Sequence, residues 1–174
     1  RDTATVDELR RLRAATHDLS EASARGEVLS RVIEFAGESF ARVAMFMVRD
    51  GQAVGMAESG TNIGGGADSA TLSEISLQIA DCAWFESVLE GRVAVRATPS
   101  EADREVCDRL ATPGRERPLE VYVGPIESSG QVVALLYADH LPEQRAIGDT
   151  SALEVVLSHA GLALDRAVLE RALH

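Results

Sequence analysis

The chain has 174 residues, of which 45% are hydrophobic and 26% are charged. This length and composition suffice to bury one hydrophobic core, and the chain is short for two domains. Its formal net charge of −11 would repel a phosphate backbone or an anionic membrane surface. No apolar run approaches the roughly 20 residues of a membrane span, so we expect neither a nucleic acid nor a membrane as a partner. The polar N-terminal stretch lacks a signal-peptide segment and a starting Met, and we expect part of a longer protein.

Two residue types limit the chemistry of the chain. All 17 basic residues are Arg, which excludes a Schiff-base lysine and the lysine of a phosphate-binding P-loop. Cys82 and Cys107 form no CxxC motif, and two thiols in a chain of this size suit the reducing cytoplasm. The neighbouring Asp81 and Asp108 disfavour a thiolate, so we expect structural cysteines. The sequence indicates no catalytic residue and no metal site, and it identifies no cofactor.

The N-terminal third of the sequence predicts two helices followed by a hairpin. Apolar residues at spacings of three and four indicate helices over 6–24 and 28–40. The pattern then changes to a continuous apolar run over 43–48, which stops at the turn signal Asp50-Gly51. We expect the partner strand at 52–57.

The middle of the sequence predicts short elements between two loops. Gly, Ser, Thr, Asn and Asp dominate 58–70, which we interpret as a loop. Beyond it the patterns predict, in order, a strand at 75–79, a helix at 82–90, a strand at 93–95, a helix from 99 to about 110 and a polar loop at 112–118.

The C-terminal third predicts two strong strands, 119–126 and 132–138, and a final helix that begins at Asp149 or Thr150. With no repeat or linker in the chain, these elements predict one α+β fold, an antiparallel sheet with helices at both chain ends. Residues 1–24 are expected to form a signalling and dimerisation helix beside a domain over 25–174.

The last helix is apolar over far more of its circumference than the ~100° stripe of an ordinary surface helix. One of its faces can lie on the sheet, and another needs a second partner. We expect a homodimer built from the first and last helices of two copies, and the alternative is that these two helices cover one another within one copy. The predicted dimer residues are Leu9, Leu12, Leu157, Leu164 and Val168.

The last two predicted strands contain a recognisable pattern. Pro125-Ile126 ends one strand and GQVVALLYAD follows at 130–139. This resembles the strand–turn–strand of the GAF family of sensory domains, in which the pattern P-(I/L)-x(3–4)-G-x-(V/I)-x-G-x-L-x-x-D recurs. The closing helix at 151–173 looks like the last helix of the family. The resemblance covers about residues 25–170. It implies a central antiparallel sheet of five or six strands, with the first and last helices on one face and short helices and loops around a small-molecule pocket on the other.

The chain departs from the best-defined branches of that family. The Asn-Lys-Phe-Asp-Glu set of cyclic-nucleotide-binding members is impossible without Lys, and neither Cys is followed by His as in bilin-binding members. The cysteine arrangement of free-methionine-sulfoxide reductases is not recognisable either. The identity of a ligand therefore does not carry over.

Aromatic residues form the candidate ligand site. Under the family topology, Trp84 and Phe85 lie on a helix over the pocket side of the sheet, and Tyr122 and Tyr137 face that same side from adjacent strands. Either Arg92 or Arg96 could pair with an anionic group. Apolar walls with a few polar groups are typical of small-ligand sites, and equally of a filled core. The predicted ligand-binding residues are Phe46, Trp84, Phe85, Arg92, Tyr122 and Tyr137.

The resemblance implies a non-catalytic sensory or regulatory module that binds a small molecule or a partner. Such a module would act on a neighbouring output domain of the full-length protein through its terminal helices. One alternative is a ligand-free scaffold of the same fold that serves only dimerisation or protein contact. Another is a thiol-dependent reductase of a small sulfoxide that uses Cys82 and Cys107.

Overall fold

The computed structural model describes residues 2–56, 75–110 and 117–173. The predicted loop at 58–70 lies outside these ranges, as does 112–116 of the second predicted loop. The helices are α1 (Asp2–Glu21), α2 (Arg25–Gly37), α4 (Ala83–Gly91), α5 (Arg104–Leu110) and α6 (Ser151–Leu173), with short 3₁₀ turns at Ile79–Asp81 and Glu101–Asp103. The strands are β1 (Arg42–Arg49), β2 (Gln52–Gly55), β3 (Ser76–Gln78), β4 (Val95–Ala97), β5 (Val121–Ser128) and β6 (Gln131–Asp139).

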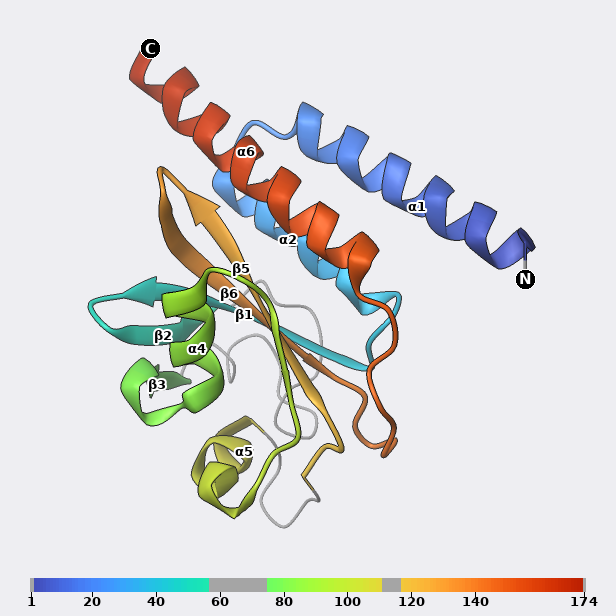
Figure 1. Ribbon diagram of the computed structural model, residues 1–174. Helices are drawn as coiled ribbons and strands as arrows, with labels where there is room; N and C mark the ends of the chain where they lie inside the picture. The colour runs from blue at the N-terminus through green and yellow to red at the C-terminus, as the bar shows by residue number, and fades with distance from the viewer. Residues whose placement is uncertain (1, 57–74, 111–116, 174) are drawn as a thin grey trace.

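These elements form three layers (Figure 1). The middle layer is a six-stranded sheet in the order β3-β2-β1-β6-β5-β4, and every neighbouring pair is antiparallel. Helices α1, α2 and α6 lie on one face of the sheet, and α4 and α5 lie on the other. The predicted α+β architecture, with its terminal helices on one face, is confirmed.

Two tight turns set the pairing of the central strands. Asp50 and Gly51 close the β1–β2 hairpin with φ angles of 48° and 77°. Ser129 and Gly130 close the β5–β6 hairpin with φ angles of 55° and 78°. Two left-handed residues in succession match the twist of the flanking strands, which explains why an Asp-Gly pair between apolar runs predicted a hairpin.

The sheet is buried on both faces, because alternate side chains of its strands enter two different cores. In β1, Val43 and Met45 face the layer of α1, α2 and α6, whereas Ala44 and Phe46 face α4 and α5. All four side chains are fully buried. This double burial explains why the central strands appear in the sequence as continuous apolar runs and not as an alternation.

Helix α6 lies unusually close to β5. A Cβ atom on Gly161 would lie 2.4 Å from the backbone oxygen of Glu127, and a Cβ atom on Gly124 would lie 2.5 Å from Cδ1 of Leu157. Gly161 therefore requires glycine for the observed approach, because the atom it faces belongs to the backbone, whereas at Gly124 the Leu157 side chain could give way. The helix is also tied to the end of α1, since Arg166 donates from Nη2 to the carbonyl oxygens of Leu19 (3.1 Å) and Ala22 (2.6 Å).

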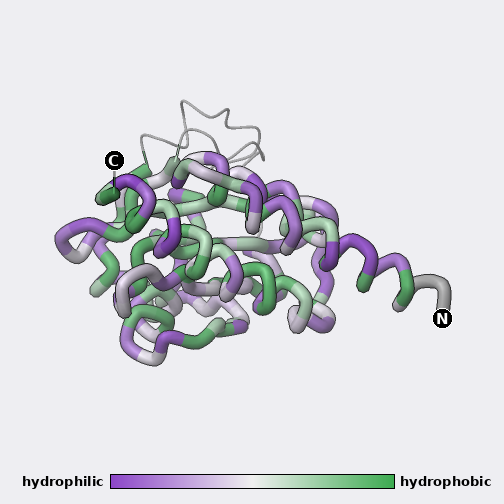
Figure 2. Tube along the Cα trace, turned by 90° about the horizontal axis from the view of Figure 1, so that it is seen from above, coloured by the Kyte–Doolittle hydropathy of each residue, from purple (hydrophilic) through white to green (hydrophobic). Residues whose placement is uncertain are grey.

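Helix α1 packs its apolar side chains against the body through its C-terminal half, and Arg11 nearer its N-terminus forms an ion pair with Glu38 at 3.2 Å. Leu19 and Ala22 are buried against the core of α2 and α6, and Leu12 is half-buried beside them. Viewed from above, the N-terminal end of α1 extends beyond the rest of the molecule, and Leu9 there is 59% exposed (Figure 2). The first and last helices thus cover one another within the protomer, and they do so over only part of their length.

Candidate functional site

Four of the six predicted ligand residues come together under α4. Phe46 of β1 lies with its ring centroid 5.4 Å from that of Phe85. Trp84 stacks on Tyr137 of β6 with 6.4 Å between centroids and 26° between ring planes. All four side chains are buried in the core that α4 and α5 form with the sheet. We call Phe46, Trp84, Phe85 and Tyr137 the aromatic cluster.

The prediction that Tyr122 faces the same side as Tyr137 is wrong, because of a β-bulge. At the end of the hairpin Ser128 pairs with Gln131, and this register, continued, would place Tyr122 opposite Tyr137. The register shifts between Ile126 and Glu127, so that Tyr122 pairs with Ala138 instead. A shift of one residue moves a side chain to the other face of the sheet. Tyr122 therefore lies in the core of α1, α2 and α6.

Arg92 also lies apart from the aromatic cluster. It follows the end of α4 in a left-handed conformation, with a φ angle of 57° and its backbone N–H donating to the carbonyl of Val88. Its exposed guanidinium forms an ion pair with Glu127 of β5, at 3.5 Å between Nε and Oε1. In the structure, the anionic group that pairs with Arg92 is therefore the Glu127 carboxylate of the same chain.

Sequence reasoning missed a buried ion pair at the end of the aromatic cluster. Arg42 donates to both carboxylate oxygens of Asp139, at 2.9 and 2.6 Å, and to the carbonyl of Leu110 at 2.9 Å. The hydroxyl of Tyr137 donates to the same carboxylate. Burial and the Asp139 charge raise the pKa of Tyr137 well above its ordinary value, so its hydroxyl stays protonated. A charged residue at the end of each of two adjacent apolar strands is the signal that could have indicated this pair.

Both cysteines are buried on the same side of the sheet. Burial is the main cause that raises the pKa of Cys82 and of Cys107 to about 11. The charge of Asp103 adds to the rise at both thiols. At neutral pH both side chains are therefore thiols and not the nucleophilic thiolates.

The predicted dimer residues fall into two groups. Leu157 and Leu164 are 3% and 4% exposed, because they pack into the core beneath α6. This placement corrects the predicted interface, since neither side chain is available to a second copy. Leu9 and Val168 are exposed, and Leu12 is half-buried.

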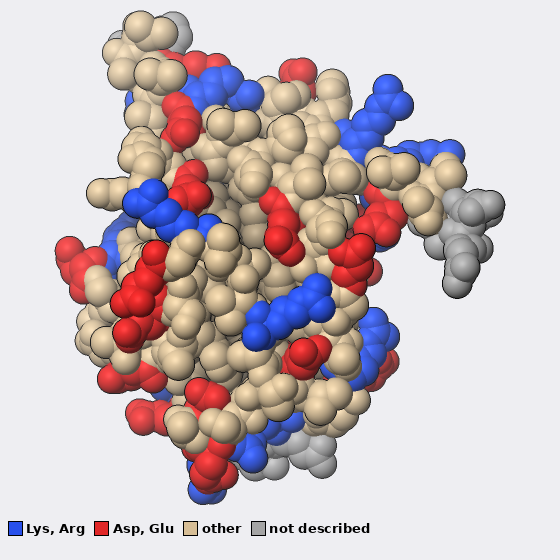
Figure 3. All heavy atoms as spheres, in the orientation of Figure 1, with Lys and Arg blue, Asp and Glu red and all other residues tan. Residues whose placement is uncertain are grey.

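A different line of apolar side chains is exposed on α6. Val155, Leu162 and Leu169 are 40%, 65% and 65% exposed, and they follow one another every seven residues, so they lie along one side of the helix. In the space-filling view, uncharged atoms gather over α6 with scattered charged side chains around them (Figure 3). We call Val155, Leu162 and Leu169 the outer line of α6.

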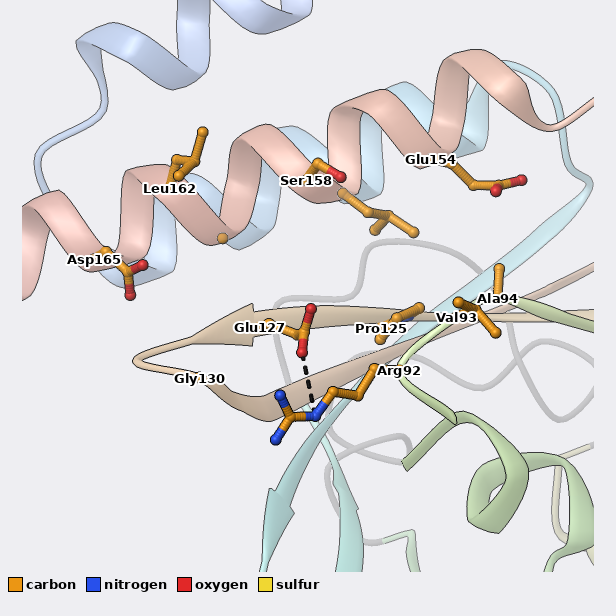
Figure 4. Close-up of a pocket in the computed structure, with 12 residues that line it drawn as sticks. Arg92, Val93, Ala94, Pro125, Glu127, Gly130, Glu154, Ser158, Leu162 and Asp165 are labelled. Atoms are coloured by element: carbon orange, nitrogen blue, oxygen red, sulfur yellow. Dashed lines mark ion pairs between the residues drawn. The ribbon is translucent and has the colours of Figure 1, made fainter. Parts of the chain in front are cut away.

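Grooves lie on both sides of Leu162, the middle residue of the outer line. One, of about 620 Å³, runs between α6, β5 and the segment 92–94, and Figure 4 shows it below the helix with Leu162 pointing outward at its rim. The other, of about 260 Å³, lies between α6 and the end of α1. Leu162 borders both grooves and so forms a ridge between them. Charged groups line the larger groove but have internal partners: Asp165 accepts from the hydroxyl of Ser128 at 2.7 Å.

Two further properties of the described residues bear on function. Within residues 2–56, 75–110 and 117–173, no group of three or more His, Cys, Asp or Glu side chains is placed to hold a metal ion. None of the helices in these ranges combines the length and the apolarity that a membrane crossing requires.

Known structures share the arrangement described above. No family model and no curated protein matches the sequence. The phycoerythrobilin-bound GAF domain of a cyanobacterial phytochrome is 12% identical with a TM-score of 0.68, over 96% of this chain and 99% of that one. Residues 122 to 287 of a methyl-accepting chemotaxis protein are 16% identical with a TM-score of 0.67, over 91% and 99%. Reduced fRMsr of Staphylococcus aureus, an enzyme, is 12% identical with a TM-score of 0.63, over 90% and 94%. The chain therefore has the GAF fold.

Proposed function

We propose that the chain is a non-catalytic sensory or regulatory module of a larger signalling protein, with α6 as the helix that transmits the signal. The observation that carries the proposal is the outer line of α6, an apolar helix face that the protomer leaves uncovered. Similar folds in a phytochrome and a chemotaxis protein support a signalling role. A neighbouring domain in the full-length protein would receive the signal.

The partner that best fits the outer line is a second copy of the chain. A surface on which a ridge lies beside a groove is complementary to itself about a twofold axis. Leu162 is such a ridge, and the larger groove next to it has apolar walls that include Val93 and Pro125. In the proposed dimer, Leu162 of each copy packs into the larger groove of the other. Val93 is 63% exposed in the protomer, and this packing would cover it.

Light scattering tests the dimer. We expect the parent chain to be a dimer at about 50 μM, and Leu162→Asp to be a monomer, because its carboxylate would be buried in a groove that already holds the carboxylates of Glu127 and Asp165. The matched control is Leu119→Asp, which alters another exposed leucine away from α6 and should remain a dimer. A monomeric parent chain, or a dimeric Leu162→Asp variant, would overturn this part of the proposal.

Binding of a small molecule on the α4 side belongs to the same proposal. The competing function is a ligand-free scaffold, and the close packing of the aromatic cluster favours it. Native mass spectrometry of the purified chain and a thermal-shift screen of small metabolites separate the two. A bound mass, or a Tm that rises with ligand concentration, supports a sensor. A chain that carries no extra mass and responds to no compound supports the scaffold.

The reductase alternative finds less support in the thiols. A pKa of about 11 at both cysteines leaves little thiolate at neutral pH. The direct test is reduction of free methionine sulfoxide by the chain in the presence of a thiol reductant. Turnover that disappears in the Cys82→Ser/Cys107→Ser variant would establish the enzyme and overturn the non-catalytic assignment.

A further inference from the structure

A short relay of hydrogen bonds joins the edge of the sheet to the beginning of α6. Arg96 of β4 donates from Nη1 to the carbonyl of Ile147 at 3.0 Å and from Nη2 to Oγ1 of Thr150 at 3.1 Å. The Thr150 hydroxyl in turn donates to Glu154 at 2.6 Å. Thr150 directly precedes α6 and Glu154 lies in its first turn. We call Arg96, Thr150 and Glu154 the relay.

The relay connects the edge of the sheet to the helix layer that contains α6. Strand β4 is at one edge of the sheet and pairs through three residues with β5. It follows α4 after the short segment 92–94 (Figure 1), and α4 carries Trp84 and Phe85 of the aromatic cluster. Chain continuity thus links α4 to β4, and the hydrogen bonds of Arg96 link β4 to the beginning of α6.

A buried hydroxyl without a partner lies beside the relay. Tyr122 is the cross-strand partner of Arg96, and its side chain is fully buried. Within the described residues its hydroxyl has no hydrogen-bond partner. A Cβ atom on Gly124 would lie 3.0 Å from this hydroxyl and 2.5 Å from Leu157, so the hydroxyl lies close to α6, about one turn beyond Glu154. Burial and the charge of Glu154 raise the pKa of Tyr122.

We propose that the beginning of α6 has two hydrogen-bonding states and that Arg96 selects between them. In the first state, the one described above, Glu154 accepts from Thr150, which Arg96 holds in place. In the second, Glu154 accepts from the hydroxyl of Tyr122. The second state exchanges the bond to Thr150 for a partner to a buried hydroxyl that otherwise has none, at the cost of drawing the exposed Glu154 carboxylate partly out of water. The inference rests on the proposed function, because it takes α6 as the transmitting helix.

The two tyrosines of the chain provide a direct measurement. Carbon-13 at the ring carbon that bears the hydroxyl gives one NMR signal for Tyr122 and one for Tyr137. Tyr137 donates to Asp139 and serves as the internal reference for a phenol bonded to a carboxylate. In the Arg96→Met variant, which keeps the apolar stem and loses the donors, we expect the Tyr122 signal to shift towards that of Tyr137. We also expect amide hydrogen exchange in the first turn of α6 to increase about tenfold.

Three further variants separate a switch from a purely structural contact. Thr150→Val removes the hydroxyl that holds Glu154 and should shift the Tyr122 signal in the same direction. Adding Tyr122→Phe to Arg96→Met removes the second state, so exchange should return towards the parent rate. The control Arg104→Met alters an exposed arginine of α5, which pairs with exposed Glu101, and should change neither signal nor exchange.

The outcomes are distinct. An unmoved Tyr122 signal in Arg96→Met and Thr150→Val, or exchange that stays fast after the addition of Tyr122→Phe, would overturn the two-state relay. Neither result depends on a ligand or a second copy. The relay can therefore fail while Leu162→Asp still abolishes the dimer, and the dimer can fail while the Tyr122 signal still moves.

Discussion

The close approach of α6 to β5 makes Gly161 the position where a single methyl group has the largest calculable effect. In Gly161→Ala the new Cβ would lie 2.4 Å from the Glu127 backbone oxygen, whereas real Cβ atoms essentially never come within 3.0 Å. The helix and the strand must therefore separate by about 0.6 Å, the difference between these two distances. The oxygen belongs to the backbone and cannot rotate away as a side chain could. Overpacking of this kind costs about 1–3 kcal/mol.

A second helical glycine, Gly26 in the first turn of α2, allows for part of the effect of helix propensity in this comparison. Replacing Gly by Ala inside a helix stabilises it by up to about 1 kcal/mol. Gly26 lies in α2, and a Cβ atom there would meet nothing within 4 Å. We expect Gly161→Ala to be less stable than Gly26→Ala by about 1–3 kcal/mol in urea unfolding, followed by the fluorescence of the single tryptophan. Equal stability of the two variants would refute the described contact between α6 and β5.

Two further changes test the layer of α4 and α5. Arg42→Met leaves Asp139 buried without its ion pair and should lower the free energy of unfolding in urea by about 3–5 kcal/mol. The control Arg31→Met removes a surface ion pair and should change that free energy by no more than about 0.5 kcal/mol. A small effect at Arg42 would contradict the buried ion pair. Folding raises the pKa of Cys82 and Cys107 from 9.0 to about 11, so their contribution to stability is complete below pH 9.0 and is lost as the pH rises to 11. The Cys82→Ala/Cys107→Ala variant should lose less stability over that range, and parallel losses would contradict the raised thiol pKa values.

The fold was predictable because local signals in the sequence agree with it. The pair Asp50-Gly51 favours the left-handed turn that it adopts, and the apolar run that precedes it has the length of a buried strand. The apolar spacing predicted a helix over 6–24 and α1 spans Asp2–Glu21, so the helix itself was predicted while its two ends were misplaced by four and three residues. The strand predicted at 93–95 lies two residues further along the chain, at Val95–Ala97, because an alternation this short does not fix where a strand begins.

The candidate site was less predictable, because it depends on register and on tertiary cover. The single extra residue, Val133 of β6, decides which face Tyr122 occupies. The one local signal is Pro125, because proline inside a non-edge strand favours a bulge, but it does not say which way the register shifts. The apolar circumference of α6 was correctly recognised, but periodicity alone does not say which neighbour covers which side. The helices α1 and α2 and the sheet bury Leu157 and Leu164, and Leu162 remains outside.

Cross-linking between two cysteine variants tests the proposed packing of α6 against a second copy most directly. Leu162→Cys and Val93→Cys, each in the Cys82→Ala/Cys107→Ala background, are mixed under mild oxidation and separated by non-reducing electrophoresis. We expect the mixed disulfide to form faster than either self-pair, since the ridge of one copy contacts the groove of the other. Cross-links no faster than those of a Leu119→Cys control would contradict the dimer and remove the main support for α6 as the transmitting helix.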